Sequence, residues 1–125
     1  GGAEMGAYAT AFPGGVEIGP DTAAALSRVW GFDVPERPGL DTVEALEAAE
    51  RGELDAFYCS GGNFLETLPE PDRVAVALGR IPLRVHVDIV LSSQMLVPPA
   101  ETVFVLPAQT RYEQTGGGTE TTTER

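Results

Sequence analysis

Residues 54–91 constrain the fold most, because they carry the pattern of a strand, a helix and a second strand. Residues 54–59 are a short, mostly apolar run of the kind found in strands. A helical pattern opened by Pro69 or Pro71 follows, and residues 83–91 then alternate with the two-residue period of a strand. A unit of this length is typical of two parallel strands joined by a right-handed crossover. The sequence therefore predicts an α/β fold with a small parallel sheet flanked by helices.

Two more helices and a third strand complete the predicted layout. Residues 20–30 place Leu26, Val29 and Trp30 on one helical face, and Gly31 follows as a left-handed cap. The other elements are a helix at residues 40–52 and a strand at residues 102–107. In the second strand, one face carries Leu83, Val85 and Val87 and the other carries Arg84, His86 and Asp88. We expect helices on both faces of the sheet.

Composition divides the chain of 125 residues into three parts. Residues 1–19 are rich in Gly and Ala, keep no period, and predict an irregular segment. Residues 20–108 predict one α/β domain that is large enough for a hydrophobic core. Residues 109–125 are rich in Gly and Thr and predict a flexible tail. Neither end shows the start or finish of an element, so we expect a domain excised from a longer protein.

Charge and hydropathy restrict the partners. The formal net charge is −11, and the 8 basic residues are all arginines scattered along the chain. Such an acidic surface repels phosphate backbones, so nucleic acid is not an expected partner. We expect no membrane segment and no secretory signal, because no apolar run approaches the length of a membrane-spanning helix and no signal pattern opens the chain. The expected location is cytoplasmic.

One cysteine and one histidine limit the metal and redox chemistry of the chain itself. Cys59 lies in a strand-like run, where a free cysteine usually acts as a small buried hydrophobe. His86 lies in the middle of a strand and is expected to pack or bond locally. One residue of each kind cannot supply an internal disulfide, an iron–sulfur cluster or a conventional zinc site.

Polar residues and glycines follow each predicted strand. The carboxyl ends of parallel strands meet at one edge of a sheet, where ligands bind. Glycines there leave N–H groups free for a ligand, a following helix favours phosphate, and an aspartate can accept two N–H bonds. The set fits a nucleotide-like, anionic ligand. The candidate binding residues are Gly61, Gly62, Asn63, Thr67, Asp88 and Ser92.

Each of these residues also has a purely structural interpretation. Gly-Gly-Asn is a common turn, Asp88 can be a cap or a surface charge, and serines often occupy turns. The chain has no nucleophile elbow, no flanked carboxylate pair and no Walker loop. We therefore predict no catalytic residue and no metal ligand, and residue patterns alone lead no further than an α/β domain with a nucleotide as its candidate ligand.

Four stretches, in order along nearly the whole chain, resemble the alpha subunits of molybdopterin-dependent oxidoreductases. They are GGAEMGAYATAFPGG, GLDTVEALEAAERGELDAFYCSGGNF, RVHVDIVLSSQML and VFVLPAQTRYEQTGGGTETTTER. The likeness is to the formate dehydrogenase-like branch of the DMSO reductase superfamily. The chain departs from the family pattern at Glu4, where aspartate is usual, at Val87, where glutamine is frequent, and at Val103, where many relatives carry aspartate.

The resemblance implies a Rossmann-like domain of a subunit that binds a molybdopterin guanine dinucleotide cofactor with molybdenum. It implies that Gly61, Asn63, Thr67 and Asp88 meet the guanosine and phosphate parts, with Ser92 near further polar contacts. In this family the metal performs the electron transfer and the protein supplies binding and orientation. The metal ligand, any iron–sulfur cluster and most of the small-molecule substrate site would lie in other domains of the parent subunit. We therefore expect an enzymatic parent and an inactive isolated chain.

Two other hypotheses stay open at this stage. The chain can be a stand-alone nucleotide-binding or protein-interaction module without redox activity. It can also be a structural piece whose loops pack against sister domains and touch no ligand.

Overall fold

The computed structural model describes residues 9–110, 112, 113, 115 and 116. The described residues divide into two compact units, one that runs up to Val43 and one that begins at Glu44, and each unit has a core of its own. Most of the first family motif and most of the tail expected at residues 109–125 lie outside the described residues.

The first unit opens with a small hairpin. Strand β1 (Ala11–Phe12) pairs antiparallel with β2 (Val16–Glu17). The turn between them holds Gly14 and Gly15 at φ +83° and +76°, a conformation that only glycine adopts without steric cost. Over this stretch the structure differs from the irregular segment expected at residues 1–19. Strands of two residues are too short to produce a period in the sequence.

Helix α1 (Pro20–Trp30) begins with proline and ends at a left-handed Gly31, as predicted. Its buried face differs from the prediction: Val29 and Trp30 are 78% and 44% exposed, and Trp30 stacks on Phe32 with the ring centroids 5.7 Å apart. The core of this unit is Phe12, Ala23 and Val34, with Ile18 and Leu26 packed against it. This small core does not reach the last turn of the helix.

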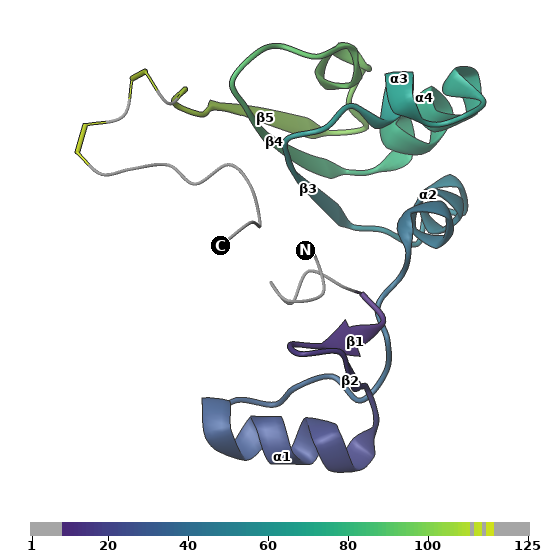
Figure 1. The fold of residues 1–125 in the computed structure, drawn as a ribbon. Helices are drawn as coiled ribbons and strands as arrows, with labels where there is room; N and C mark the ends of the chain where they lie inside the picture. Colours follow the sequence, from purple (N-terminus) through teal and green to yellow (C-terminus); the bar gives the residue numbers. More distant parts are fainter. Residues whose placement is uncertain (1–8, 111, 114, 117–125) are drawn as a thin grey trace. The chain divides into compact units, whose positions relative to one another are not determined.

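The second unit carries the predicted strand–helix–strand pattern (Figure 1). A helix that begins just before the boundary leads into it, and the segment after β4 contains only a short 3-10 helix, η1. The elements are α2 (Thr42–Glu50), β3 (Ala56–Ser60), α3 (Phe64–Thr67), α4 (Pro71–Arg80), β4 (Leu83–Asp88), η1 (Ser93–Leu96) and β5 (Thr102–Pro107).

The three strands form a parallel sheet in the order β3-β4-β5, which confirms the predicted fold class. Cys59 lies beside His86, which in turn lies beside Val105. Neighbours in a parallel sheet point to the same face, so the register assigns every strand side chain to one of two faces.

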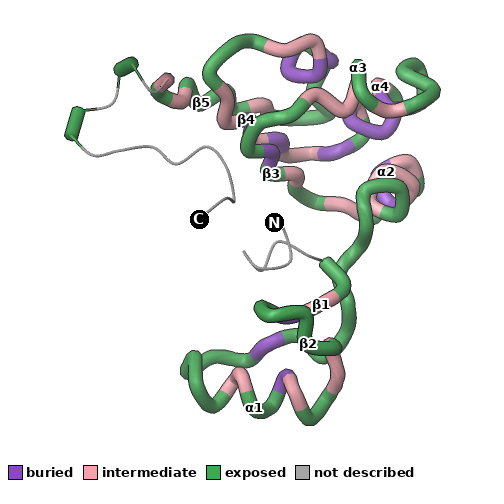
Figure 2. The backbone as a smooth tube through the Cα atoms, viewed as in Figure 1, coloured by how far each residue is buried: buried purple, intermediate pink, exposed green. Residues whose placement is uncertain are grey.

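The core of this unit lies on one face of the sheet. Buried residues, purple in Figure 2, gather on α4 and on the segment before β5. The core residues are Ala49, Val74, Ala77, Leu78, Ile81 and Val97, with Phe57 and others packed against them. On the opposite face Tyr58 and Phe104 are 68% and 53% exposed.

This one-sided arrangement differs from the expected helices on both faces of the sheet. The chain moves across the sheet in one direction, from β3 to β4 to β5. Crossovers of the same hand that proceed in the same direction all lie over the same face. A second covered face would need a reversal of strand order, which the three strands do not contain.

The polar row of β4 is the buried one. Arg84 and His86 are fully buried, whereas Val85 and Val87 on the apolar row are partly exposed. His86 packs locally, as expected, with its ring edge toward Phe57 at a centroid distance of 6.0 Å. Neither of its ring nitrogens has a hydrogen-bond partner among the described residues.

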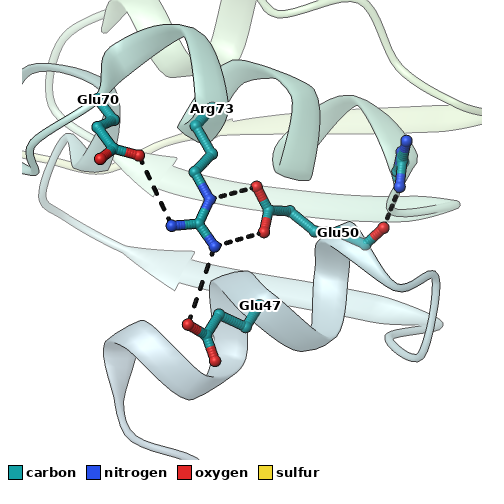
Figure 3. A network of polar contacts seen from close by, with 5 residues as sticks. Glu47, Glu50, Glu70 and Arg73 are labelled. Atoms are coloured by element: carbon teal, nitrogen blue, oxygen red, sulfur yellow. Dashed lines mark hydrogen bonds and ion pairs between the residues drawn. The ribbon is translucent and has the colours of Figure 1, made fainter.

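An arginine on α4 links that helix to α2 (Figure 3). The Nε and Nη2 of Arg73 donate to the two carboxylate oxygens of Glu50 at 2.6 and 2.7 Å. Glu70 and Glu47 lie 3.6 and 3.8 Å from the same guanidinium group. These hydrogen bonds raise the pKa of Arg73 and lower the pKa of Glu50. The network joins the two helices that border the core.

Within the part of the chain that the structure describes, no helix combines the length and apolar character needed to cross a lipid bilayer.

Candidate functional site

The loops after the three strands begin at one edge of the sheet. The N–H of Gly61, just after β3, donates to the carbonyl of Val87 on β4 at 2.8 Å. The N–H of Ala108, just after β5, donates to the carbonyl of Asp88 at 2.8 Å. The structure therefore brings the Gly-Gly-Asn loop, Asp88 and the exit of β5 together, as the sequence-based argument requires.

Gly61 and Gly62 give the first loop its shape. Their φ values are +72° and +83°, and a Cβ added to either would meet no atom within 4 Å. The glycines are therefore needed for backbone conformation, and the space beside them is open. Among the described residues, no hydrogen bond uses the N–H groups of Gly62 and Asn63. These two groups are available as donors.

The side chain of Asn63 is held from the loop that follows β4. Its Nδ2 lies 3.1 Å from the Oγ of Ser93, and its Oδ1 lies 3.3 Å from the same oxygen. The hydroxyl of Ser93 also donates to the carboxylate of Glu66 on α3 at 2.6 Å. Elements thirty residues apart in the chain thus meet at this asparagine.

The side chain of Gln94 holds the Gly-Gly-Asn loop in place through hydrogen bonds to its main chain. It is fully buried, its Oε1 accepts the N–H of Phe64 at 2.9 Å, and its Nε2 donates to the carbonyl of Gly62 at 2.7 Å. Arg84 donates to the main-chain carbonyls of Gln94 and Val97. No motif of the sequence points to Gln94, and its one signal is that of a polar residue directly before the apolar pair Met95-Leu96.

The carboxylate of Asp88 uses one of its two oxygens in a hydrogen bond. One carboxylate oxygen accepts the N–H of Ile89 at 2.7 Å, a local bond in the bend after β4 and not a helix cap, because η1 begins only at Ser93. No hydrogen bond from a described residue reaches the second oxygen. One acceptor at this strand end is therefore available to a ligand.

Thr67 and Ser92 differ in accessibility, because Thr67 is exposed whereas the hydroxyl of Ser92 is buried. The hydroxyl of Thr67 donates to the carbonyl of Asn63 at 2.8 Å, across one turn of α3. The hydroxyl of Ser92 is buried and has no hydrogen-bond partner in the described part of the chain. The first group stabilises the loop, and the second is the unsatisfied polar atom of the site.

The helix after Asn63 differs from the expected phosphate site. α3 has only four residues, so its macrodipole is small, and its first N–H is already bound to Gln94. The ionisable side chains identified at this edge, Glu66 and Asp88, are acidic. The edge therefore suits hydrogen-bond donors of a ligand better than its phosphates.

Cys59 and His86 offer no reactive group at this edge. The thiol of Cys59 donates to the carbonyl of Gly61 at 3.0 Å, and burial raises its pKa, which disfavours the thiolate. Burial, with Arg84 nearby, lowers the pKa of His86 and keeps the imidazole neutral. The described residues contain no group of three or more His, Cys, Asp or Glu side chains that could hold a metal ion.

Comparison with known proteins gives matches to parts of longer chains. No family model matches. Nitrate reductase of Klebsiella oxytoca is 37% identical over 91 residues, which are 72% of this chain and 10% of that protein. An uncharacterized oxidoreductase of Mycobacterium tuberculosis is 36% identical over 91 residues, 73% of this chain and 12% of that protein.

A third relative belongs to another kind of redox protein. It is a component of the NADH-quinone oxidoreductase of Streptomyces coelicolor and is 40% identical over 77 residues, 60% of this chain and 9% of that protein. The chain spans about a tenth of the length of these curated relatives. The matches support membership of this chain in an oxidoreductase family.

Proposed function

We propose that this chain is one segment of a molybdopterin-dependent oxidoreductase subunit of the formate dehydrogenase-like branch, and that it helps to hold the guanine dinucleotide part of the cofactor. The binding residues would be Gly61, Gly62, Asn63 and Asp88, supported by Thr67 and Ser92. The parent would transfer electrons to or from a small substrate, and its other segments would be the partners of this chain.

The observation that supports this proposal most is that the carboxyl ends of three parallel strands lie at one edge of the sheet. The bond from Gly61 to the carbonyl of Val87 places the glycine loop beside the strand end that carries Asp88. Ligands of open parallel sheets bind outside the carboxyl ends of the strands. The relatives named as reductases and oxidoreductases support a redox parent of the kind that this proposal needs.

The groups at the edge fit the nucleoside end of such a cofactor. The free N–H groups of Gly62 and Asn63 can donate, and the free oxygen of Asp88 can accept from a base or a ribose hydroxyl. The open space beside the two glycines allows close approach of a ligand to the backbone. When bound, the cofactor would supply the metal-centred electron transfer, while these residues bind and orient its tail.

The test is Asn63→Ala in the full-length protein that contains this chain. We expect fewer molybdenum atoms and fewer guanine nucleotides per purified polypeptide, with the circular dichroism spectrum and the melting temperature retained. The matched control is Glu101→Ala, because Glu101 is exposed and precedes β5 at the opposite edge of the sheet. Full occupancy in the Asn63→Ala protein would reject the proposed role.

A further inference from the structure

We propose that Ser93 and Glu66 are positioning residues that set the orientation of the Asn63 side-chain amide, so that its oxygen is presented to an N–H group of the ligand. The inference rests on the proposed function for the identity of the ligand, and on the contacts of these three residues for the orientation itself.

The hydroxyl of Ser93 has one hydrogen and two nearby acceptors. The carboxylate of Glu66 is 2.6 Å away, and the Oδ1 of Asn63 is 3.3 Å away. A hydroxyl can donate only once, and a short bond to a carboxylate is stronger than a long bond to an amide oxygen. The hydrogen of Ser93 therefore goes to Glu66.

This choice fixes the amide of Asn63. With its hydrogen used, the Ser93 oxygen can only accept, and the Nδ2 of Asn63 donates to it at 3.1 Å. The flipped amide would exchange the two contacts, so that its oxygen would take the shorter one, 3.1 Å from the Ser93 oxygen, and its nitrogen the longer one at 3.3 Å. Oδ1 of Asn63 and the second hydrogen of Nδ2 are then left for a ligand.

The remaining donor and acceptor match a nucleobase edge better than a phosphate. A base carries N–H groups beside acceptors, whereas a phosphate oxygen carries no hydrogen to donate to Asn63. Glu66 and Asp88 also place negative charge near the loop, which disfavours a phosphate group there. The positioned amide would thus select the base of the nucleotide.

The orientation is tested first without any ligand, by nuclear magnetic resonance of the 125-residue chain. One side-chain amide proton of Asn63 should exchange slowly with water, because it is bound to Ser93. Ser93→Ala should abolish that protection, and Ser93→Thr, which keeps the hydroxyl, should retain it. Equal exchange of both protons in the unchanged chain, or no effect of Ser93→Ala, would overturn the orientation.

The specificity is tested by titration of the same chain with GMP and with ribose 5-phosphate, which lacks the base. GMP alone should shift the amide signals of residues 61–63. Glu66→Ala should weaken GMP binding about threefold to tenfold, the value of one hydrogen bond, because the freed hydrogen of Ser93 turns to Oδ1 of Asn63. Glu101→Ala, which removes the same charge elsewhere, should bind as the unchanged chain does.

A double variant separates positioning from charge. If Glu66 acts through Ser93, then Ser93→Ala with Glu66→Ala should bind GMP no more weakly than Ser93→Ala alone. Losses that add would show that Glu66 acts by itself and would overturn the proposal. If GMP shifts no signal while the Asn63 proton is protected, the proposed nucleotide binding fails for this chain and the orientation stands.

Discussion

Replacement of Gln94 tests how the candidate site is held together. Gln94 is fully buried and bonds to the N–H of Phe64 and the carbonyl of Gly62. Gln94→Met keeps the size of the side chain and removes these two bonds, together with the longer contact of 3.5 Å from its Nε2 to the Sγ of Cys59. Gln94→Ala removes the bonds and also leaves a cavity. Comparison of the two variants separates the polar contribution from the packing contribution.

The expected magnitudes follow from the exposure of the two partners. A fully buried group left without a partner costs up to about 3 kcal/mol, but a typical bond contributes about 1 kcal/mol. Gly62 is exposed and Phe64 is only partly buried, so water replaces part of each lost bond. Gln94→Met should therefore lower the unfolding free energy by about 2 kcal/mol. Gln94→Ala should lower it by about 3–4 kcal/mol, since a cavity is added.

Amide hydrogen exchange in β4 is the appropriate assay, because the slowest amides of the central strand report the opening of this unit. The fluorescence of Trp30 is not, because that residue belongs to the other unit. Gln109→Met makes the same substitution at an exposed position and should change stability by less than about 0.5 kcal/mol. A Gln94→Met chain as stable as this control would refute the reasoning, because the two bonds would then contribute nothing.

Two further predictions concern the N-cap residue of α4, Glu70, and the ion pair that Arg73 makes on the surface of this helix. Glu70 has φ +58°, a left-handed conformation that disfavours side chains, so Glu70→Gly should raise the unfolding free energy by about 0.5–1 kcal/mol, whereas Glu70→Ala should not. Urea unfolding of the three chains would decide this, and a stabilised Glu70→Ala would contradict it. The hydrogen bonds from Arg73 lower the pKa of the Glu50 carboxyl in the folded chain. The pair therefore stabilises the fold fully at pH values above the pKa that Glu50 has in the unfolded chain. This stabilisation disappears as the pH falls through the lower pKa that Glu50 has in the folded chain. The difference in stability between the unchanged chain and Arg73→Gln should therefore shrink on acidification from pH 7, and a difference independent of pH would contradict the assignment.

Local chemistry explains which parts of the fold the sequence could predict. Pro20 and Gly31 mark both ends of α1, and the alternation from Leu83 to Asp88 identifies β4. These signals depend on the residues themselves, through backbone preference and the period of a strand. The convergence of Asn63 and Asp88 at one edge was also predictable, because it follows from parallel strands alone.

Contacts between distant segments explain what the sequence could not predict. Gln94 lies in η1, a stretch whose sequence has no helical or strand period, and its role appears only when η1 packs against the turn after β3. The burial of Arg84 and His86 also reverses the usual preference, since the polar row of β4 faces the core. The single covered face of the sheet follows from strand order, which no local pattern contains.

The buried polar residues of β4 and η1 explain why the site can be rigid without a strong local fold. α3 has a single turn, and the segment between β4 and β5 has little regular structure, so neither is stable alone. Arg84 holds the main chain of η1 from the central strand, and the side chain of Gln94 then holds the glycine loop. Buried polar groups are costly unless they are bonded, so each bond that forms also excludes other arrangements of these loops. The position of Asn63 is therefore set by the sheet through two successive side chains, and not by the propensity of its own segment.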